Sequence, residues 1–204
     1  MTCPDCVTTE KIWAEGIAYR QDHDGFPPRL EQEYRFHTTG VARFSALLAK
    51  ALNLDSNKAY VLGLLHDYGK RNDDYKSNIF HGLDGYYEML RLGYPDVARI
   101  CLTHTFREPD FDNQDYNYPD QWLDECRKLL RQYTYNDYDR IVQYADLFFE
   151  GLNIVRLEDR VAGIAARYRI SPHQLANLSN SVFKLKEIID RQCGCDSYTI
   201  LGIK

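Results

Sequence analysis

The chain has 204 residues, of which 44% are hydrophobic, so it can build a core of its own and wholesale disorder is excluded. Its formal net charge of -5 argues against a general nucleic-acid or anionic-membrane binder, which would carry a basic surface. No apolar run approaches the roughly 18 residues that a membrane span requires, and the first residues lack the basic start and apolar segment of a signal peptide. We therefore expect a cytoplasmic protein that does not contact membranes.

Helical periodicity runs through most of the chain, and no repeat, linker or low-complexity tract divides it. Residues 24–28 break the first expected helix, and Asp55 or Ser56 can cap the third, which carries the sequence VLGLLHDYGK. Pro95 and Ser171 stand at favoured starting positions of later helices. Besides the third, the expected helices cover residues 9–22, 30–53, 82–92, 95–106, 119–132, 137–150, 158–169 and 172–192.

Strand patterns are confined to a short alternation in the tail, residues 198–203, while residues 107–121 have no period and are predicted to form a long loop. The sequence therefore predicts an all-α fold, a helical bundle that forms one domain over residues 1–204. Its terminal helices would pack on a central part, residues 30–152, with binding residues projecting inward from facing helices.

The most informative stretch is VLGLLHDYGK, residues 61–70, which begins as an apolar helix and ends in charge. His66, Asp67 and Lys70 lie within about one helical turn, and an unpaired buried charge is costly. Adjacent His66 and Asp67 point about 100° apart on an ideal helix, so both reach one ion only near a helix end, which Gly69 permits. The stretch therefore indicates a partner or a catalytic task for these residues.

Other polar residues also lie in apolar helical company: His37 in HTTGVARFSALLAKAL, His81 in NIFHGLDGYYEML, His104 in ARICLTHTF and Asp146 in IVQYADLFFEG. A single helical histidine is more often a hydrogen-bonded residue than a ligand, and a lone aspartate usually caps or pairs. Together, however, imidazoles and carboxylates are a common ligand set for Zn, Mn, Fe, Ni or Co. A divalent ion would also offset the burial of two aspartates.

The order His37, then His66-Asp67, then Asp146 resembles the H…HD…D pattern of the HD superfamily, which comprises all-α metal-dependent phosphohydrolases. The similarity extends from about residue 36 to residue 151 and includes HTTGVAR and the stretch HGLDGYYEMLRLGYPDVARICLTHT. The resemblance implies an HD-domain bundle in which these four residues bind one metal ion.

In binuclear members of that superfamily, two further histidines bind a second ion and the aspartate of the doublet bridges both ions. His81 and His104 occupy the matching places here, so the resemblance favours two ions over one. Fe, Mn, Zn, Ni and Co are the candidates, and the imidazole-rich ligand set argues against Mg²⁺ as the sole occupant while leaving it among the candidates.

The chain is also similar to HD proteins that hydrolyse dinucleoside tetraphosphates symmetrically, which read roughly H-T-x-G-V-A and H-D-Y-x-K. Two departures matter. No GYP directly follows the doublet, which argues against a cyclic dinucleotide phosphodiesterase of the HD-GYP type, and the tyrosine-bearing loop 107–120 is unexpected in the tetraphosphatases. Nucleoside monophosphates and dinucleoside polyphosphates therefore both stay open as substrates.

These features predict a metal-dependent phosphohydrolase that acts on a nucleotide or another small phosphate ester, with metal-activated water as the nucleophile. Asp67 and Lys70 are the predicted catalytic residues; the alternative for Lys70 is a solvated lysine at a helix C-terminus. Lys70, Arg71 and Arg107 are predicted to bind substrate, and Lys76 would extend the basic patch. The sequence leaves the oligomeric state open.

Aromatic residues of the long loop, Phe111, Tyr116 and Tyr118, suit stacking on a base or closure over the site. The acidic residues of the same loop, such as Glu108 and Asp110, would repel phosphate unless they point away. The sequence therefore assigns this loop no role in substrate binding.

Two other classes of function compete with the enzyme. One is a catalytically weak HD module that holds metal and serves a regulatory or ligand-binding role; the other is a helical interaction protein with structural histidines. A complete set of presumptive ligands favours the enzyme over both.

The cysteines form a short C-P-D-C near one end, with Cys3 and Cys6, and C-G-C near the other, with Cys193 and Cys195. If the two ends met, four sulfurs could hold a structural zinc ion. Because each half alone is a weak signal, free thiols are the favoured interpretation.

Overall fold

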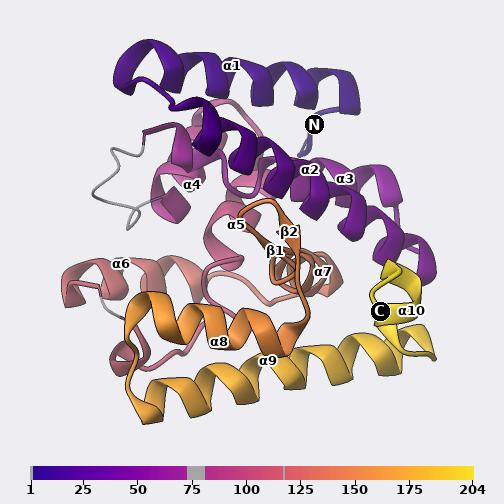
Figure 1. Ribbon diagram of the computed structural model, residues 1–204. Helices are drawn as coiled ribbons and strands as arrows, with labels where there is room; N and C mark the ends of the chain where they lie inside the picture. The colour runs from indigo at the N-terminus through magenta and orange to yellow at the C-terminus, as the bar shows by residue number, and fades with distance from the viewer. Residues whose placement is uncertain (1, 73–80, 117) are drawn as a thin grey trace.

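The computed structural model describes residues 2–72, 81–116 and 118–204, and these residues form an all-α bundle with one very small sheet (Figure 1). The α-helices are α1 Cys6–Asp24, α2 Pro28–Ala51, α3 Ser56–Leu65, α4 His81–Arg91, α5 Pro95–Thr103, α6 Asp120–Leu130, α7 Asp137–Asp146, α8 Leu157–Tyr168, α9 Pro172–Cys193 and α10 Ser197–Leu201. Two 3₁₀ turns, η1 Tyr68–Asn72 and η2 Asn113–Asp115, and a hairpin of β1 Phe149–Glu150 with β2 Asn153–Ile154 complete the described elements. None of the described helices combines the length and the apolar character that crossing a bilayer demands.

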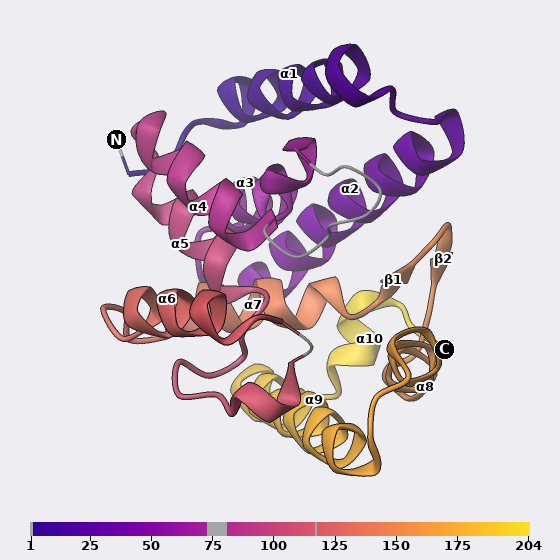
Figure 2. The same ribbon diagram turned by 90° about the vertical axis from the view of Figure 1, so that its left-hand side faces the viewer.

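The helices form two groups on either side of α7. Figure 2 shows α1 to α5 above and α8, α9 and α10 below, with α6 and α7 between them. Helix α2 packs along α3 and against α7, and α9 packs against both α7 and α8. Helix α7 therefore lies at the centre of the bundle, in contact with both groups.

Local signals explain where several helices begin. The Asp55 carboxylate accepts hydrogen bonds from the backbone N–H groups of Asn57 and Lys58 at the start of α3, as the sequence predicted. Ser171 caps α9 and forms a reciprocal capping box with Gln174. Pro95 occupies the first turn of α5.

The core follows the helical period. Leu48 of α2, Leu62 and Leu65 of α3, Met89 of α4 and Tyr144 of α7 are at most 1% exposed and belong to one apolar cluster. Helices α2 and α4 each contribute one apolar face at 3.6-residue spacing, whereas residues 61–65 of α3 are all buried, so α3 is surrounded by the core. This packing holds α2, α3 and α4 together with α7.

The tail corrects one sequence prediction, because residues 198–203 lie largely in helix α10 and form no strand. Asp196 caps this helix, Gly202 ends it in a left-handed conformation, and the ring of Tyr198 packs edge-on against Phe148. Without a neighbouring strand, the backbone groups of a short apolar tail are satisfied within helical turns. The hairpin at residues 149–154, which the sequence did not indicate, forms where α7 ends at Asp146 instead of at residue 150.

A buried carboxylate joins α5 to α7. Asp139 is fully buried and pairs with Arg99, accepts a hydrogen bond from Thr103 Oγ1 at 2.8 Å, and accepts another from the backbone N–H of Asn136 at 2.7 Å. A fully buried carboxylate needs its cation, because an unpaired charge in the interior is strongly unfavourable. This ion pair therefore holds together the helices that precede His104 and carry Asp146.

We expect Arg99→Gln to lower the free energy of unfolding by about 3 kcal/mol, because it leaves Asp139 buried without its cation. Arg140→Gln is the matched control: its partner Asp137 lies 3.4 Å away and both side chains are partly exposed, so the loss should stay below about 0.5 kcal/mol. Urea unfolding of both variants measures the difference. Equal losses would show that the buried pair does not hold α5 and α7 together.

Candidate metal centre

The fold brings the six predicted ligands into one cluster at the centre of the bundle. His37 lies midway along α2, His66 and Asp67 directly follow α3, and His81 begins α4. His104 follows α5 and Asp146 is the last residue of α7. The cluster is thus assembled from segments more than a hundred residues apart in the chain.

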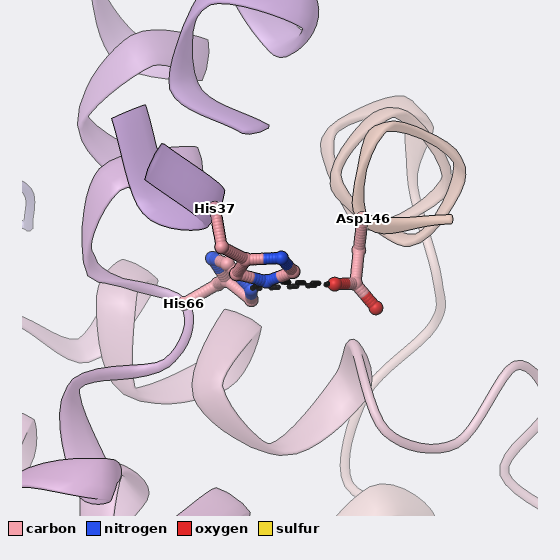
Figure 3. Close-up of side chains that lie close together, drawn as sticks. All are labelled: His37, His66 and Asp146. Atoms are coloured by element: carbon pink, nitrogen blue, oxygen red, sulfur yellow. Dashed lines mark hydrogen bonds and ion pairs between the residues drawn. The ribbon is translucent and has the colours of Figure 1, made fainter. Parts of the chain in front are cut away.

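Four of these side chains surround one point. His37 Nε2 lies 3.0 Å from Asp146 Oδ1, 3.2 Å from His66 Nε2 and 3.3 Å from Asp67 Oδ2. His66 Nε2 is 3.4 Å from Asp67 Oδ2 and 3.6 Å from Asp146 Oδ1. Figure 3 shows the two imidazoles facing the carboxylate of Asp146 from the opposite side. Ligands at about 2.0–2.1 Å from a tetrahedral ion lie about 3.3 Å apart, so the spacing of these donors fits a metal ion.

A second group meets the other oxygen of the same aspartate. His81 Nε2 and His104 Nε2 are 3.1 Å apart, and each lies 3.4 Å from Asp67 Oδ1. Asp67 thus presents Oδ2 to one pair of histidines and Oδ1 to the other. Ligand atoms from His66, Asp67 and His104 also lie close enough together to share an ion.

The end of α3 explains how His66 and Asp67 point into the same space. The helix stops at Leu65, the backbone N–H of Lys70 bonds to the Asp67 carbonyl at 3.0 Å, and the chain tightens into η1. A Cβ on Gly69 would lie 1.8 Å from the carbonyl oxygen of His81. Only glycine therefore allows α4 to approach closely enough for His81 to reach Asp67.

Hydrogen bonds set the tautomers of two histidines. His66 Nδ1 lies 2.7 Å from the Gly63 carbonyl and His104 Nδ1 lies 3.1 Å from the Ile100 carbonyl. A carbonyl only accepts, so each Nδ1 carries the proton and each Nε2 keeps a lone pair that faces the cluster. This orientation is the one in which a backbone carbonyl supports a metal-binding imidazole.

The electrostatics keep the carboxylates ionised. Burial alone would raise the pKa of Asp67, but Lys70 and His66 hold it well below the ordinary value. Burial likewise opposes ionisation of Asp146, and hydrogen bonds from His37 and His66 lower its pKa well below the usual range. The cluster therefore supplies anionic oxygens at neutral pH, as a divalent cation requires.

The two histidines of the first group shift in opposite directions. Burial lowers the pKa of His66 below its ordinary value. Burial also acts to lower the pKa of His37, but hydrogen bonds with Asp146 and Asp67 outweigh it and raise the pKa. Without a metal ion, His37 is thus the imidazole of this pair that holds a proton more readily.

The basic residues predicted to bind substrate lie in different surroundings. Lys70 Nζ is 2.6 Å from Asp67 Oδ2 and so lies at the cluster. Arg71 pairs with Glu88 at 3.0 Å and packs over the rings of Tyr19 and Tyr68, none of which is a predicted ligand. Lys76 lies outside the described residues. The roles in substrate binding stay predictions for Lys70 and Arg71.

Arg107 borders a cavity of about 430 Å³ next to the cluster. The cavity is lined by the loop after α5 and by α8 and α9, and its basic side chains include Arg160 and Arg167 of α8. Sequence reasoning missed Arg160, because an arginine within an amphipathic helix carries no local signal that distinguishes it from a surface residue. Only the approach of α8 to the loop identifies it.

The four terminal cysteines do not form the zinc site that the sequence left open. Within residues 2–72, 81–116 and 118–204, no group of closely spaced metal-ligating side chains includes a cysteine. Figure 1 places the two ends of the chain at different parts of the molecule. Burial raises the pKa of the Cys3 thiol to about 12, so that side chain is a neutral thiol.

A family model for the HD domain matches residues 34–149, which is more than half of the chain. No curated protein and no solved structure matches the chain. The chain therefore belongs to the HD domain family, as the residue pattern predicted. Membership and the His/Asp groups together indicate a phosphohydrolase-type module that can hold a divalent metal ion. The finer similarity to dinucleoside tetraphosphatases has no support in these comparisons.

We expect the affinity for a divalent metal to fall as the pH drops below the raised pKa of His37, by up to about tenfold per pH unit. The reason is that a metal must displace the proton on this imidazole, whereas Asp67 and Asp146 stay ionised. In the metal-free protein, protonated His37 stabilises the fold below its unfolded-state pKa, and this contribution is lost as the pH rises through the folded-state value. Competition with a chelator between about pH 6 and pH 8 measures the slope; a flat profile would contradict it.

Proposed function

We propose that this protein is a metal-dependent phosphohydrolase with two metal ions, and that its substrate is a nucleotide or another small phosphate ester. The observation that carries the proposal is the position of Asp67, whose two carboxylate oxygens face two separate pairs of histidines. A bridging carboxylate between two ligand sets is what a binuclear hydrolytic centre requires. Membership of the HD family supports the reaction class.

The residues present fit the two ions. His37, His66, Asp67 and Asp146 would hold one ion, and His81, His104 and Asp67 the other. The mixed imidazole and carboxylate donors favour Fe, Mn, Zn, Ni or Co. When bound, such ions neutralise phosphoryl oxygens and lower the pKa of water toward neutrality.

The chain itself contributes charge and orientation. Asp67 is 1% exposed and fixed by Lys70, so the carboxylate cannot turn away from either pair of histidines. The Lys70 ammonium lies at the edge of the first ligand group and can donate to a phosphate oxygen that approaches the cluster. His66 and His104 are held by the carbonyl groups behind them and present Nε2 without reorganisation.

We expect His104→Ala to reduce the metal content from about two ions per chain to about one, because it removes a ligand of the second group alone. Elemental analysis after reconstitution with Mn or Fe measures this. His23→Ala is the matched control, since His23 stacks on Tyr19 at the surface and belongs to neither ligand group. If the wild type and His104→Ala both held one ion per chain, the binuclear centre would be contradicted.

We expect Lys70→Gln to lower kcat/KM for a phosphomonoester such as p-nitrophenyl phosphate by about 10- to 100-fold while the metal content stays unchanged. Asp67→Asn, which removes the bridging charge, should abolish turnover and metal binding together with the helical circular dichroism retained. A folded, metal-loaded wild type without turnover on any phosphate ester would favour the regulatory HD module instead. Full activity of Asp67→Asn would contradict the mechanism.

A further inference from the structure

The cavity beside the metal cluster begins directly after a predicted ligand. Thr105 lines it, and the hydroxyl of Thr105 lies 3.5 Å from His104 Nε2. Arg107, two positions after Thr105, also lines it and lies close enough to Asp146 for that carboxylate to act on the Arg107 guanidinium. A molecule bound in the cavity therefore lies next to the cluster but on different residues.

Two arginines that line this cavity are incompletely paired. The Nε atoms of Arg107 and Arg160 are both buried, and neither finds a hydrogen-bond partner in the described part of the chain. No carboxylate among the described residues lies within ion-pair distance of Arg107, and the carboxylate paired with Arg160, Glu150, is 4.0 Å away and also pairs with Arg167.

The two guanidinium groups also repel each other. Burial lowers the pKa of Arg107; Tyr116 and Asp146 act to raise it, and the charge of Arg160 acts to lower it. Placing two like charges together with unsatisfied donors is unfavourable unless an anion occupies the space between them. Planar guanidinium groups match a phosphate geometrically, because each can donate two parallel hydrogen bonds.

A second part of the cavity lining, the aromatic wall, is aromatic and apolar. It includes Tyr116 and Tyr118 of the loop, whose rings are 6.2 Å apart, together with Ile164 and Tyr168 of α8. This wall is anchored: Asn177 of α9 donates to the Asp115 carboxylate at 2.8 Å. Such a surface suits a flat or apolar group, and the volume of about 430 Å³ lies within the range of small-molecule sites.

Four acidic residues of the loop line the cavity, and two of them have cationic partners. Glu108 pairs with Lys184 at 3.0 Å and Asp110 pairs with Arg131 at 2.9 Å. The other two, Asp112 and Asp115, accept hydrogen bonds from the backbone N–H of Gln114 and from the Asn177 amide. These contacts offset part of the negative charge that weighs against a substrate role for the loop.

We propose that this cavity is a specificity pocket in which Arg107 and Arg160 bind a second phosphate of the substrate, while the aromatic wall holds its apolar body. This inference rests on the proposed function, since it assumes that the reacting phosphate lies at the metal cluster. The substrate class is then an aromatic or apolar compound with at least two linked phosphates, such as a nucleoside diphosphate, in preference to a nucleoside monophosphate.

The test compares two inhibitors of p-nitrophenyl phosphate hydrolysis by the metal-loaded protein: adenosine monophosphate and the methylene analogue of adenosine diphosphate. In Arg107→Gln and in Arg160→Gln, we expect the inhibition constant of the diphosphate to rise about 10- to 100-fold. The constant for the monophosphate should change by less than about twofold, because its phosphate occupies the cluster. Arg29→Gln removes the same charge from an exposed residue of α2 that does not line the cavity, and should change neither constant.

The outcomes separate this inference from the proposed function. If the protein hydrolyses p-nitrophenyl phosphate but all variants bind both ligands as the wild type does, the pocket is refuted and the enzyme stands. If no hydrolysis occurs, dissociation constants from equilibrium dialysis replace inhibition constants, and an arginine-dependent preference for the diphosphate supports the pocket without the enzyme. Methylene diphosphonate, which lacks a nucleoside, is tested in the same way; the difference between its binding constant and that of the adenosine analogue gives the contribution of the aromatic wall to affinity. Should Arg107→Gln fail to fold, Arg160→Gln on α8 decides the outcome.

Discussion

The placement of one buried carboxylate governs the rest of this structure. Asp67 is 1% exposed, yet each of its carboxylate oxygens faces a different pair of imidazoles. The Lys70 Nζ atom lies 2.6 Å from Oδ2 of this carboxylate. An ionised carboxylate in such a position is stable only when cations or a metal ion surround it. Helices α2 to α5 and the central helix α7 must therefore converge on this point, and the core packing holds them there.

Close backbone approach makes that convergence feasible. A Cβ on Gly63 would lie 2.8 Å from the Ala42 Cα, so the absence of a side chain lets α3 pack tightly along α2, which carries His37. Gly69 does the same between η1 and α4, which begins with His81. The buried pair of Arg99 and Asp139 then ties α5 to α7. Each contact positions a ligand without itself belonging to the cluster.

The metal cluster and one side of the neighbouring cavity come from different parts of the chain. All six cluster residues lie within the stretch that matches the HD domain, residues 34–149. Helices α8 and α9 lie beyond that stretch and supply one side of the cavity, including Arg160. The HD domain would then supply the metal centre, and the cavity formed with α8 and α9 would select the substrate on which that centre acts.

The sequence by itself determined the all-α class, most helix positions, the caps at Asp55 and Ser171, and the set of residues that the structure gathers into a cluster. These features are encoded locally, in 3.6-residue periodicity, in cap chemistry and in the order of His and Asp residues. Tertiary structure alone decided that the tail forms α10, because an apolar alternation does not reveal whether a neighbouring strand exists to pair with it. It also decided that Asp67 faces both histidine pairs and that Arg107 and Arg160 line one cavity. Contacts between distant segments depend on how helices pack, and the residues that flank each position do not encode them.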